Sequence, residues 1–315
     1  MSAVIFFENL MQAVIAGLLI GSVYGLMCVG LGLIFGLMRV INFAQGEFLM
    51  LGMYGAFYVC TWFGLSSAVG PIVGAVVAGV LLYLLGMGLH KSLLTKATGI
   101  KVAGTEGEGH YPQLILTLGI SLVLANGALI IFGNTPLSIR TPYSGSAWEL
   151  GPLVGDDMLL FFNKARTIAL MVSVLVAIAV YQFVHRTRIG KSLRAAADNP
   201  AAATYMGIDV ERSHRISFGI GAAITGLAGG LIASYYPFQP YIGLDFVVIM
   251  YAGVVLGGLG SMIGAFWGGL VIGLIQQVST LFLPLQLQNA MIFLVFLLII
   301  LFRPQGLFGK NVERV

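Results

Sequence analysis

An isolated acid, Glu47, interrupts a long apolar stretch of this chain. It is the only acidic residue between positions 9 and 105, and the amides Asn42 and Gln45 lie close to it. An ionisable group at membrane depth is costly and usually faces a cavity or a partner, for which Arg39 is a candidate. These side chains could line a polar pathway at the end of a discontinuous helix. The alternative, which stays open, is a turn between two spans in which Asn42 caps the next helix.

A second break lies in the C-terminal half, where glycines separate two apolar segments. Its residues are Gly257, Gly258, Gly260 and Ser261. Paired breaks in the two halves of a membrane chain indicate an internal repeat with the passage between them, although these halves show little direct similarity. We therefore predict that the four residues lie near a translocation face, together with Asn42, Gln45 and Glu47.

A basic loop at 186–215 is the third polar feature. It holds six of the 16 Lys and Arg residues, and a short loop that basic is typical of the cytoplasmic side of a membrane. Inside it, Asn199 is an N-cap type, Pro200 suits the first helical position and Gly207 suits a left-handed stop. The pattern predicts a short helix over 199–207. Because such a helix is marginal alone in water, either the membrane domain or a docked cytoplasmic partner must hold it.

No catalytic or metal-binding pattern is found in the sequence. Gly190-Lys191-Ser192 looks like the end of a phosphate-binding P-loop, but that motif needs glycine at position 185, which is His185. There is no His-Glu-x-x-His, and no nucleophile–base set suggests an intramembrane hydrolase. We therefore predict a non-catalytic protein that has no metal or cofactor and does not hydrolyse ATP itself.

The composition shows which elements must position these residues. The chain is 58% hydrophobic and 9% charged, whereas a soluble domain carries roughly 25% charged residues. Charge-free stretches long enough for membrane helices recur along it. We predict an all-α polytopic membrane protein with eight or nine transmembrane helices in a single domain, 1–315. The expected spans are 10–37, 42–63, 68–90, 112–133, 166–185, 214–235, 245–260, 262–283 and 286–302.

The distribution of charge predicts the orientation in the lipid bilayer. Lysines between 91 and 101, the loop 186–215 and the basic tail belong inside, so the N-terminus is expected outside as part of an uncleaved first span. The segment 134–165 is expected outside with little regular structure. The aromatics of 235–245 are expected there as interfacial anchors or, alternatively, as a contact for an extracytoplasmic partner. The basic pI of about 9.1 reflects the lysines and arginines collected in these cytoplasmic segments, and it does not indicate a nucleic acid partner.

Small residues predict how the helices pack. Gly17, Gly21 and Gly25 share one helical face, and Gly260, Gly264 and Gly268 share another. Small residues at this spacing let helix backbones approach closely in lipid. Both cysteines lie in or beside apolar spans, so we expect no disulfide.

Several strings in this chain resemble one family. Residues 40–52, with Ile41-Asn42-Phe43-Ala44-Gln45-Gly46-Glu47, resemble the signature of permease subunits of branched-chain amino acid ABC importers, in which His usually stands where Gln45 is. Residues 190–199 and 206–208 are similar to the cytoplasmic coupling loop of that family. Residues 241–243 with 255–265, and the tail 303–309, resemble its C-terminal signature. The matches run in order over 17–309, and the chain length suggests the shorter of the two permeases that such systems pair.

The resemblance implies an ABC importer permease fold of two pseudo-repeated halves with broken helices. It also implies a bacterial inner-membrane assembly with a second permease subunit, two cytoplasmic ATP-binding subunits and a periplasmic substrate-binding protein. The cargo would be a branched-chain or related hydrophobic amino acid. The residues that would couple to the ATPases are Arg194, Asp198, Asn199, Pro200, Ala203, Met206 and Gly207.

Two alternatives stay open. A permease of the same family could serve urea, amides or aromatic acids. An ion-coupled secondary transporter would need intramembrane ionisable groups, for which Glu47 and Asp245 are the candidates. In that second alternative, the capped helix predicted at 199–207 would have no function.

Overall fold

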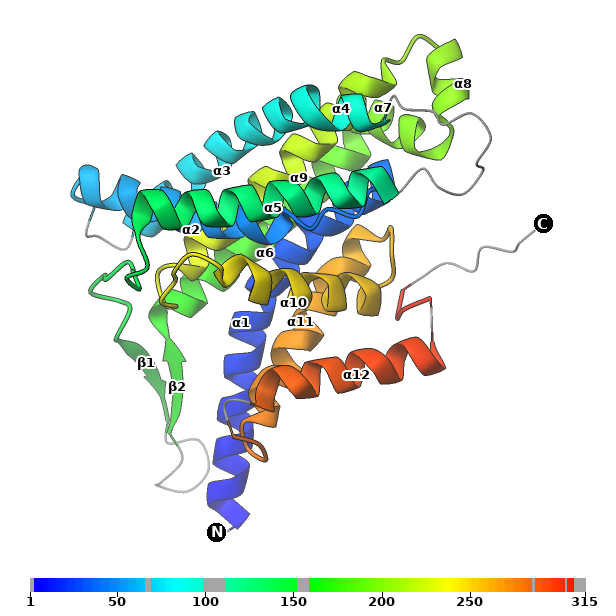
Figure 1. Cartoon of the computed structure of the whole chain (residues 1–315). Helices are drawn as coiled ribbons and strands as arrows, with labels where there is room; N and C mark the ends of the chain where they lie inside the picture. The colour runs from blue at the N-terminus through cyan, green and yellow to red at the C-terminus, as the bar shows by residue number, and fades with distance from the viewer. Residues whose placement is uncertain are drawn as a thin grey trace.

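The chain forms a bundle of long helices (Figure 1). In this computed structural model, the described residues are 3–65, 69–98, 111–151, 159–284, 287–303 and 305–308. The helices are α1 (Ala3–Met38), α2 (Gln45–Trp62), α3 (Gly70–Leu89) with a π-helical turn (His90–Leu94) and α4 (Thr95–Thr98), α5 (Tyr111–Phe132), α6 (Lys164–Arg186), α7 (Arg188–Asp198), α8 (Pro200–Tyr205), α9 (Val210–Ile232), α10 (Ile242–Gly257), α11 (Met262–Ser279) and α12 (Gln288–Phe302).

Six of these helices are long and apolar enough to cross a membrane. They are α1, α3 with its π-helical turn, α5, α6, α9 and α11. The helices α10 and α12 are apolar but shorter, and α2 has 18 residues, including Gln45 and Glu47 in its first turn. All nine lie where the sequence predicted spans, and the prediction of an all-α polytopic membrane protein is confirmed.

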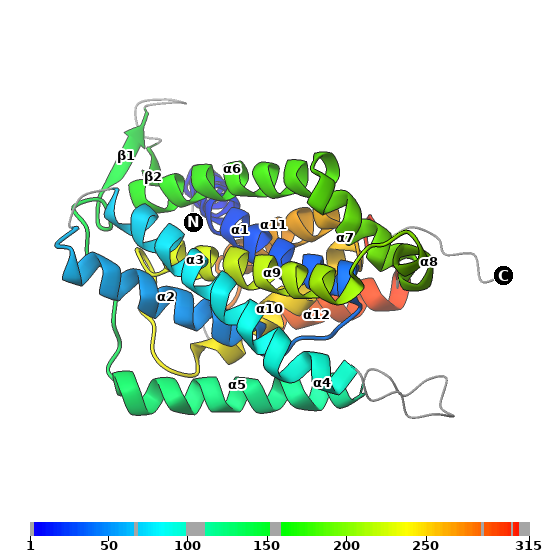
Figure 2. The same cartoon turned by 90° about the horizontal axis from the view of Figure 1, so that it is seen from above.

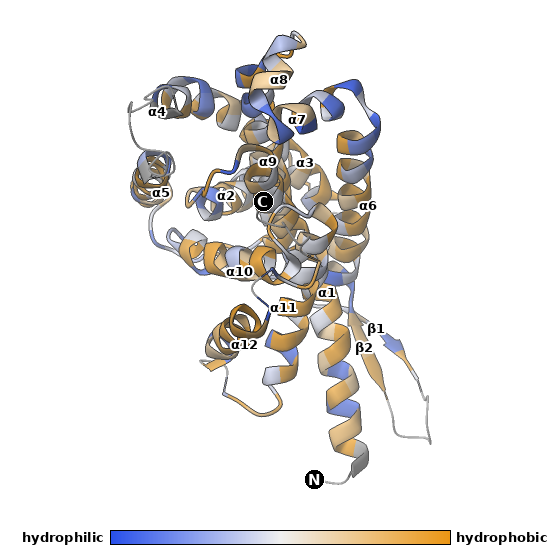
Figure 3. Cartoon of the chain, turned by 90° about the vertical axis from the view of Figure 1, so that its right-hand side faces the viewer, coloured by the Kyte–Doolittle hydropathy of each residue, from blue (hydrophilic) through white to orange (hydrophobic). Residues whose placement is uncertain are grey.

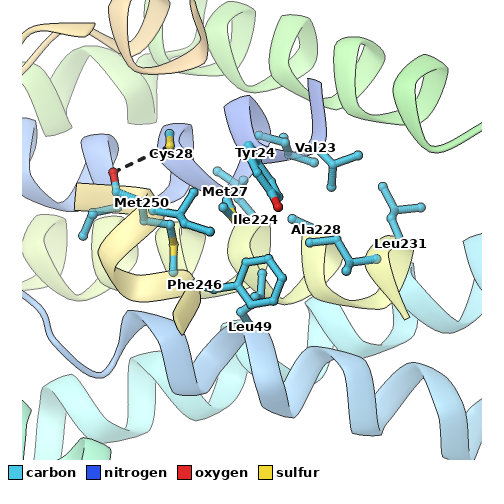
Figure 4. Packing of buried hydrophobic residues seen from close by; sticks show 14 of the residues in the cluster. Val23, Tyr24, Met27, Cys28, Leu49, Ile224, Ala228, Leu231, Phe246 and Met250 are labelled. Carbon is cyan, nitrogen blue, oxygen red and sulfur yellow. Dashed lines mark hydrogen bonds between the residues drawn. The ribbon is translucent and has the colours of Figure 1, made fainter. Parts of the chain in front are cut away.

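The core lies where α1, α2, α9 and α10 meet. Figure 4 shows Met27 of α1, Leu49 of α2, Ile224 of α9 and Phe246 of α10 packed together. Cys28 is buried beside them and contacts the carbonyl oxygen of Met250 at 3.6 Å. Both cysteines are free, as predicted.

Glycine faces bring α11 against α1 and α10. A Cβ atom placed on Gly21 would lie 2.5 Å from the carbonyl oxygen of Leu270, and one on Gly25 would lie 2.6 Å from that of Phe266. On the other side of α11, Gly264 and Gly268 meet the backbone of α10. Because no hydrophobic force joins helices within lipid, such close backbone contact is what holds these three together.

A small hairpin corrects one prediction. The segment 134–165 was expected to have little regular structure, but β1 (Ala147–Leu150) and β2 (Leu160–Asn163) pair antiparallel in it. The aromatic residues Trp148, Phe161 and Phe162 favour these short strands. The proline and glycine residues around them made the strands hard to recognise in the sequence. Leu137 also forms a bridge with Phe238, which joins this segment to the connection between α9 and α10.

The polar segments gather at two opposite ends of the bundle. The hairpin lies at one end, while α4, α7 and α8 lie at the other (Figures 1 and 2). Hydropathy colouring places many blue residues on α4, α7 and α8, whereas α5, α6 and α12 are largely orange (Figure 3). This is the segregation that the charge pattern predicted.

Candidate functional site

The basic loop 186–215 contains a helix that the sequence analysis missed. Thr187 ends α6 and caps α7, because its Oγ1 accepts a hydrogen bond from the Gly190 amide at 3.0 Å and donates to the Phe183 carbonyl at 2.7 Å. A Cβ atom on Gly190 would collide with backbone carbonyls of Phe183 and Val184. This sharp corner therefore requires glycine. The sequence signal that could have revealed α7 is Thr187, an N-cap residue, followed by Leu193 and Ala196, which α7 buries.

The predicted short helix is α8, and its ends are the predicted ones. Asn199 Oδ1 accepts from the Ala202 amide at 3.0 Å, and Pro200 occupies the first turn. Gly207 has φ +80°, the left-handed conformation that favours glycine. The Ile208 amide then donates to the Ala203 carbonyl at 2.9 Å, which completes the C-terminal cap of α8. The helix lies crosswise to α5 at the tip of the molecule (Figure 1).

Little of the protein supports α8. Its one buried residue is Ala203. The side chains that follow point outward, because Tyr205 is 89% and Met206 82% exposed. An isolated helix this short is marginal, and two large apolar side chains fully in water are unusual at an unused surface. This arrangement suits a docking element.

The Asn42–Gln45 break is not a surface turn. Asn42 and Gln45 are fully buried, and Asn42 Nδ2 donates to Gln45 Oε1 at 3.0 Å. Gln45 Nε2 donates to the Gly221 carbonyl at 3.1 Å and to Thr225 Oγ1, both on α9. Asn42 Oδ1 accepts from the Ala44 amide, but the N-cap position of α2 is Ala44 itself. These buried polar side chains find their hydrogen-bond partners within the protein, as burial requires.

Glu47 is also fully buried, beside α5 and α10. Its Oε1 accepts from Ser121 Oγ of α5 at 3.2 Å, and its Oε2 has no partner among the described residues. A Cβ atom on Gly243 would lie 2.7 Å from the Glu47 carboxyl carbon. The carboxyl group thus sits against the first turn of α10, where a helix favours negative charge. Arg39 is exposed, so the suggested pairing of Arg39 with Glu47 is wrong.

The glycine break between α10 and α11 is a tight connection at the end that carries α7 and α8. Gly258 has φ +103° and Gly260 has φ +91°, and Ser261 caps α11 through the Gly264 amide at 3.0 Å. The C-terminal tail covers this break, because the Leu307 amide donates to the Leu256 carbonyl and the Phe308 amide to that of Gly257. The tail thereby satisfies carbonyls that the end of α10 leaves open.

The two predicted breaks lie at different depths along α10. Phe43 packs on Tyr251 in the middle of that helix and Glu47 on Gly243 near its start, whereas the glycine break begins at its last residue, Gly257. Gly260 and Ser261 instead share a hollow of about 570 Å³ with Arg194 and Asp198. Two residues predicted for the translocation pathway therefore lie beside two residues predicted for coupling to the ATPases.

The opposite end carries its own hollow of about 700 Å³, between the end of α5 and the start of α10. Tyr241 and Asp245 line it, and Tyr241 donates to Asn126 Oδ1 at 3.1 Å. Phe238, expected as an interfacial aromatic, is instead fully buried against Tyr54. In the described part of the chain, no three His, Cys, Asp or Glu side chains gather closely enough to hold a metal ion.

Comparison with known proteins agrees with this architecture. The profile of the family described as "Branched-chain amino acid transport system / permease component" matches residues 13–302. The high-affinity branched-chain amino acid transport system permease protein LivH of Escherichia coli (strain K12) is 27% identical over 98% of this chain and 99% of its own length. The permease protein BraD of Pseudomonas aeruginosa is 28% identical over 97% and 98%. The probable permease LivH of Methanocaldococcus jannaschii is 30% identical over 82% and 77%. No solved structure matches significantly.

Proposed function

Because this chain belongs to the family of permease components of branched-chain amino acid transport systems, we propose that it is the membrane subunit of an ATP-driven importer. Its cargo is a branched-chain or related hydrophobic amino acid, as the names of the relatives suggest. The chain is a multi-pass membrane protein that provides a route across the membrane and catalyses no reaction itself. In a bacterial cell it resides in the inner membrane.

The observation that supports this proposal most strongly is the exposure of α8. The capped helix presents Tyr205 and Met206, almost fully exposed, at the basic end of the molecule. Positive loops face the cytoplasm, so these side chains are offered to a cytoplasmic partner. An ATP-binding subunit that holds α8 in a groove would transmit its closure to α7, which packs on α1 and α9. Arg194 and Asp198 on α7, with Asn199, extend the same coupling element.

The passage itself is proposed to run along the face where this subunit meets a second permease of the same family. A hydrophobic amino acid needs a mostly apolar route from which it can leave as readily as it enters. Asn42, Gln45 and Glu47 brace the helices beside that route. The glycine break 257–261 lies at its cytoplasmic mouth, and a substrate-binding protein delivers the amino acid at the opposite end.

Reconstitution tests the proposal. The chain is placed in liposomes with the second permease, two ATP-binding subunits and the leucine-loaded binding protein, and uptake of labelled leucine is measured. We expect uptake only when all components and ATP are present, and none with an ATPase variant that cannot hydrolyse ATP. A proton gradient should not drive uptake by this chain alone. Proton-driven uptake without partners would overturn the proposal in favour of a secondary transporter.

A further inference from the structure

An open groove runs along the outside of the bundle between α6 and α11. These two helices barely contact each other, although α1 packs against both and contributes Val29 to the lining of the groove. The groove holds about 350 Å³ between walls that include Ile178 of α6 and Trp267 of α11. Ile178 is 53% and Trp267 48% exposed, so the described part of the subunit leaves an apolar surface here uncovered.

The groove continues into the hollow at the end that carries α7. Tyr181, His185, Met262 and Ile263 line both spaces, so the apolar groove and the polar hollow form one channel along the surface. Arg186 borders the groove and Arg194 the hollow. The channel is therefore apolar along its length and basic where it reaches the water.

Arg186 is exposed at this mouth, and Arg194 keeps a donor that no described residue uses. Arg194 donates through Nη2 to the His185 carbonyl at 3.4 Å, while its buried Nε has no partner among the described residues. Among the described residues of the lining, Asp198 is the one acid and is exposed, so positive charge exceeds negative among them at this mouth. Guanidinium groups stay charged at any physiological pH and present paired donors that match phosphate oxygens.

The length of the channel corresponds to one leaflet. The lining residues of α6 run from Val174 to Arg186, roughly 18 Å of helix at about 1.5 Å per residue. Half of a ~30 Å hydrocarbon core is about 15 Å. An acyl chain that starts at the cytoplasmic interface would therefore fit beside α6 down to the middle of the bilayer.

We propose that this channel is a binding site for an anionic phospholipid of the inner leaflet. The phosphate lies between Arg186 and Arg194, and an acyl chain lies in the groove between α6 and α11. Basic pockets between helices on the cytoplasmic side suit such headgroups. A helix of a second permease fits less well, because closely packed membrane helices meet through small residues, whereas these walls carry Ile178, Ile263 and Trp267.

The exposed indole of Trp267 allows a direct test in the assembled importer. The complex is reconstituted in phosphatidylcholine vesicles that contain a minor fraction of phosphatidylglycerol, with bromine on the acyl chains of one lipid or the other. The fluorescence of the same complex with Trp267→Phe is subtracted, which isolates the Trp267 signal from every other tryptophan. We expect brominated phosphatidylglycerol to quench Trp267 well beyond its share of the lipid.

Charge variants then identify the headgroup contact. Arg186→Gln and Arg194→Gln should each lower the preference for phosphatidylglycerol about fivefold. Lys191→Gln on the exposed side of α7 removes the same charge away from the channel and should leave the preference unchanged. Quenching in proportion to lipid composition would overturn the proposal. An absence of quenching by either brominated lipid would also overturn it, because a protein side chain would then cover the groove.

Discussion

At the scale of single residues, the buried amides Asn42 and Gln45 hold the start of α2 against α9. Gln45 accepts from Asn42 and donates to Gly221 and Thr225, so it needs a donor and an acceptor at once. An amide supplies both at every pH. Because an unpaired polar group within the protein would cost a few kcal/mol, this network fixes where α2 begins against α9.

Glu47→Gln should impair transport only partly. The amide is nearly isosteric, keeps an oxygen to accept from Ser121 and removes a buried ionisable group, so we expect the initial rate of leucine uptake to fall by less than about tenfold. Uptake in proteoliposomes across neutral pH measures this. The matched variant Ser121→Ala, which removes the donor from α5, should have a comparable effect. Complete loss of uptake, with disappearance of a pH-dependent wild-type rate, would instead make Glu47 a proton-coupling site.

At the scale of elements, local signals predicted α8 but not the helix before it. The ends of α8 depend on Asn199, Pro200 and Gly207, whose preferences act over a few residues. The helix α7 carries an equally clear cap in Thr187. Its many charges made it look like a solvated loop, since the apolar face formed by Leu193 and Ala196 is narrow.

Burial of the Asn42–Glu47 group could not be decided from the sequence. Whether the segment is a turn or a buried break depends on Gly221 and Thr225, which follow Gln45 by 176 and 180 residues, and on Ser121. No local pattern encodes such partners. For the same reason, the placement of Gly260 beside Arg194 and Asp198 rather than beside Glu47 became visible only in the fold.

Met206→Asp should uncouple the permease from its ATPases. The side chain is 82% exposed, so the substitution leaves folding and insertion intact. If Met206 fills an apolar site on the ATPase, a carboxylate there should lower both uptake and substrate-stimulated ATP hydrolysis by about tenfold or more. Met206→Leu, which keeps an apolar group of similar size, should retain both activities. Normal coupling in Met206→Asp would remove α8 from the proposed contact.

At the scale of the whole molecule, the two ends are built differently. At the hairpin end, Gln12 of α1 donates to the Phe161 carbonyl at 2.8 Å and accepts from the Phe161 amide at 3.0 Å. The first helix is thereby tied to β2, which places the N-terminal part of the chain on the side of the hairpin. At the other end, short basic helices and the tail pack against the ends of the long helices.

The nine long segments were predictable because lipid imposes the same demand on each of them. Every backbone polar group must be satisfied within the segment, so long apolar runs become helices regardless of their neighbours. The glycine face with Gly21 and Gly25 was predictable for a similar reason, since small residues at helical spacing serve close contact. What they contact, Leu270 and Phe266 of α11, depends on the tertiary fold.

The positive loops and the Gln12–Phe161 tie together predict the orientation of the whole molecule. Asn9 and Glu149 lie toward the hairpin end, whereas Lys96 and Tyr205 lie at the basic end. Single cysteines placed at Asn9 or Glu149 should therefore react with a membrane-impermeant maleimide added outside intact cells. Those at the second pair should react only after the membrane is opened. The native cysteines are buried and are replaced by alanine to remove background. The cause is electrostatic, because basic segments remain on the cytoplasmic side during insertion. Labelling of Tyr205→Cys from outside would reverse the topology and separate α8 from any cytoplasmic ATPase.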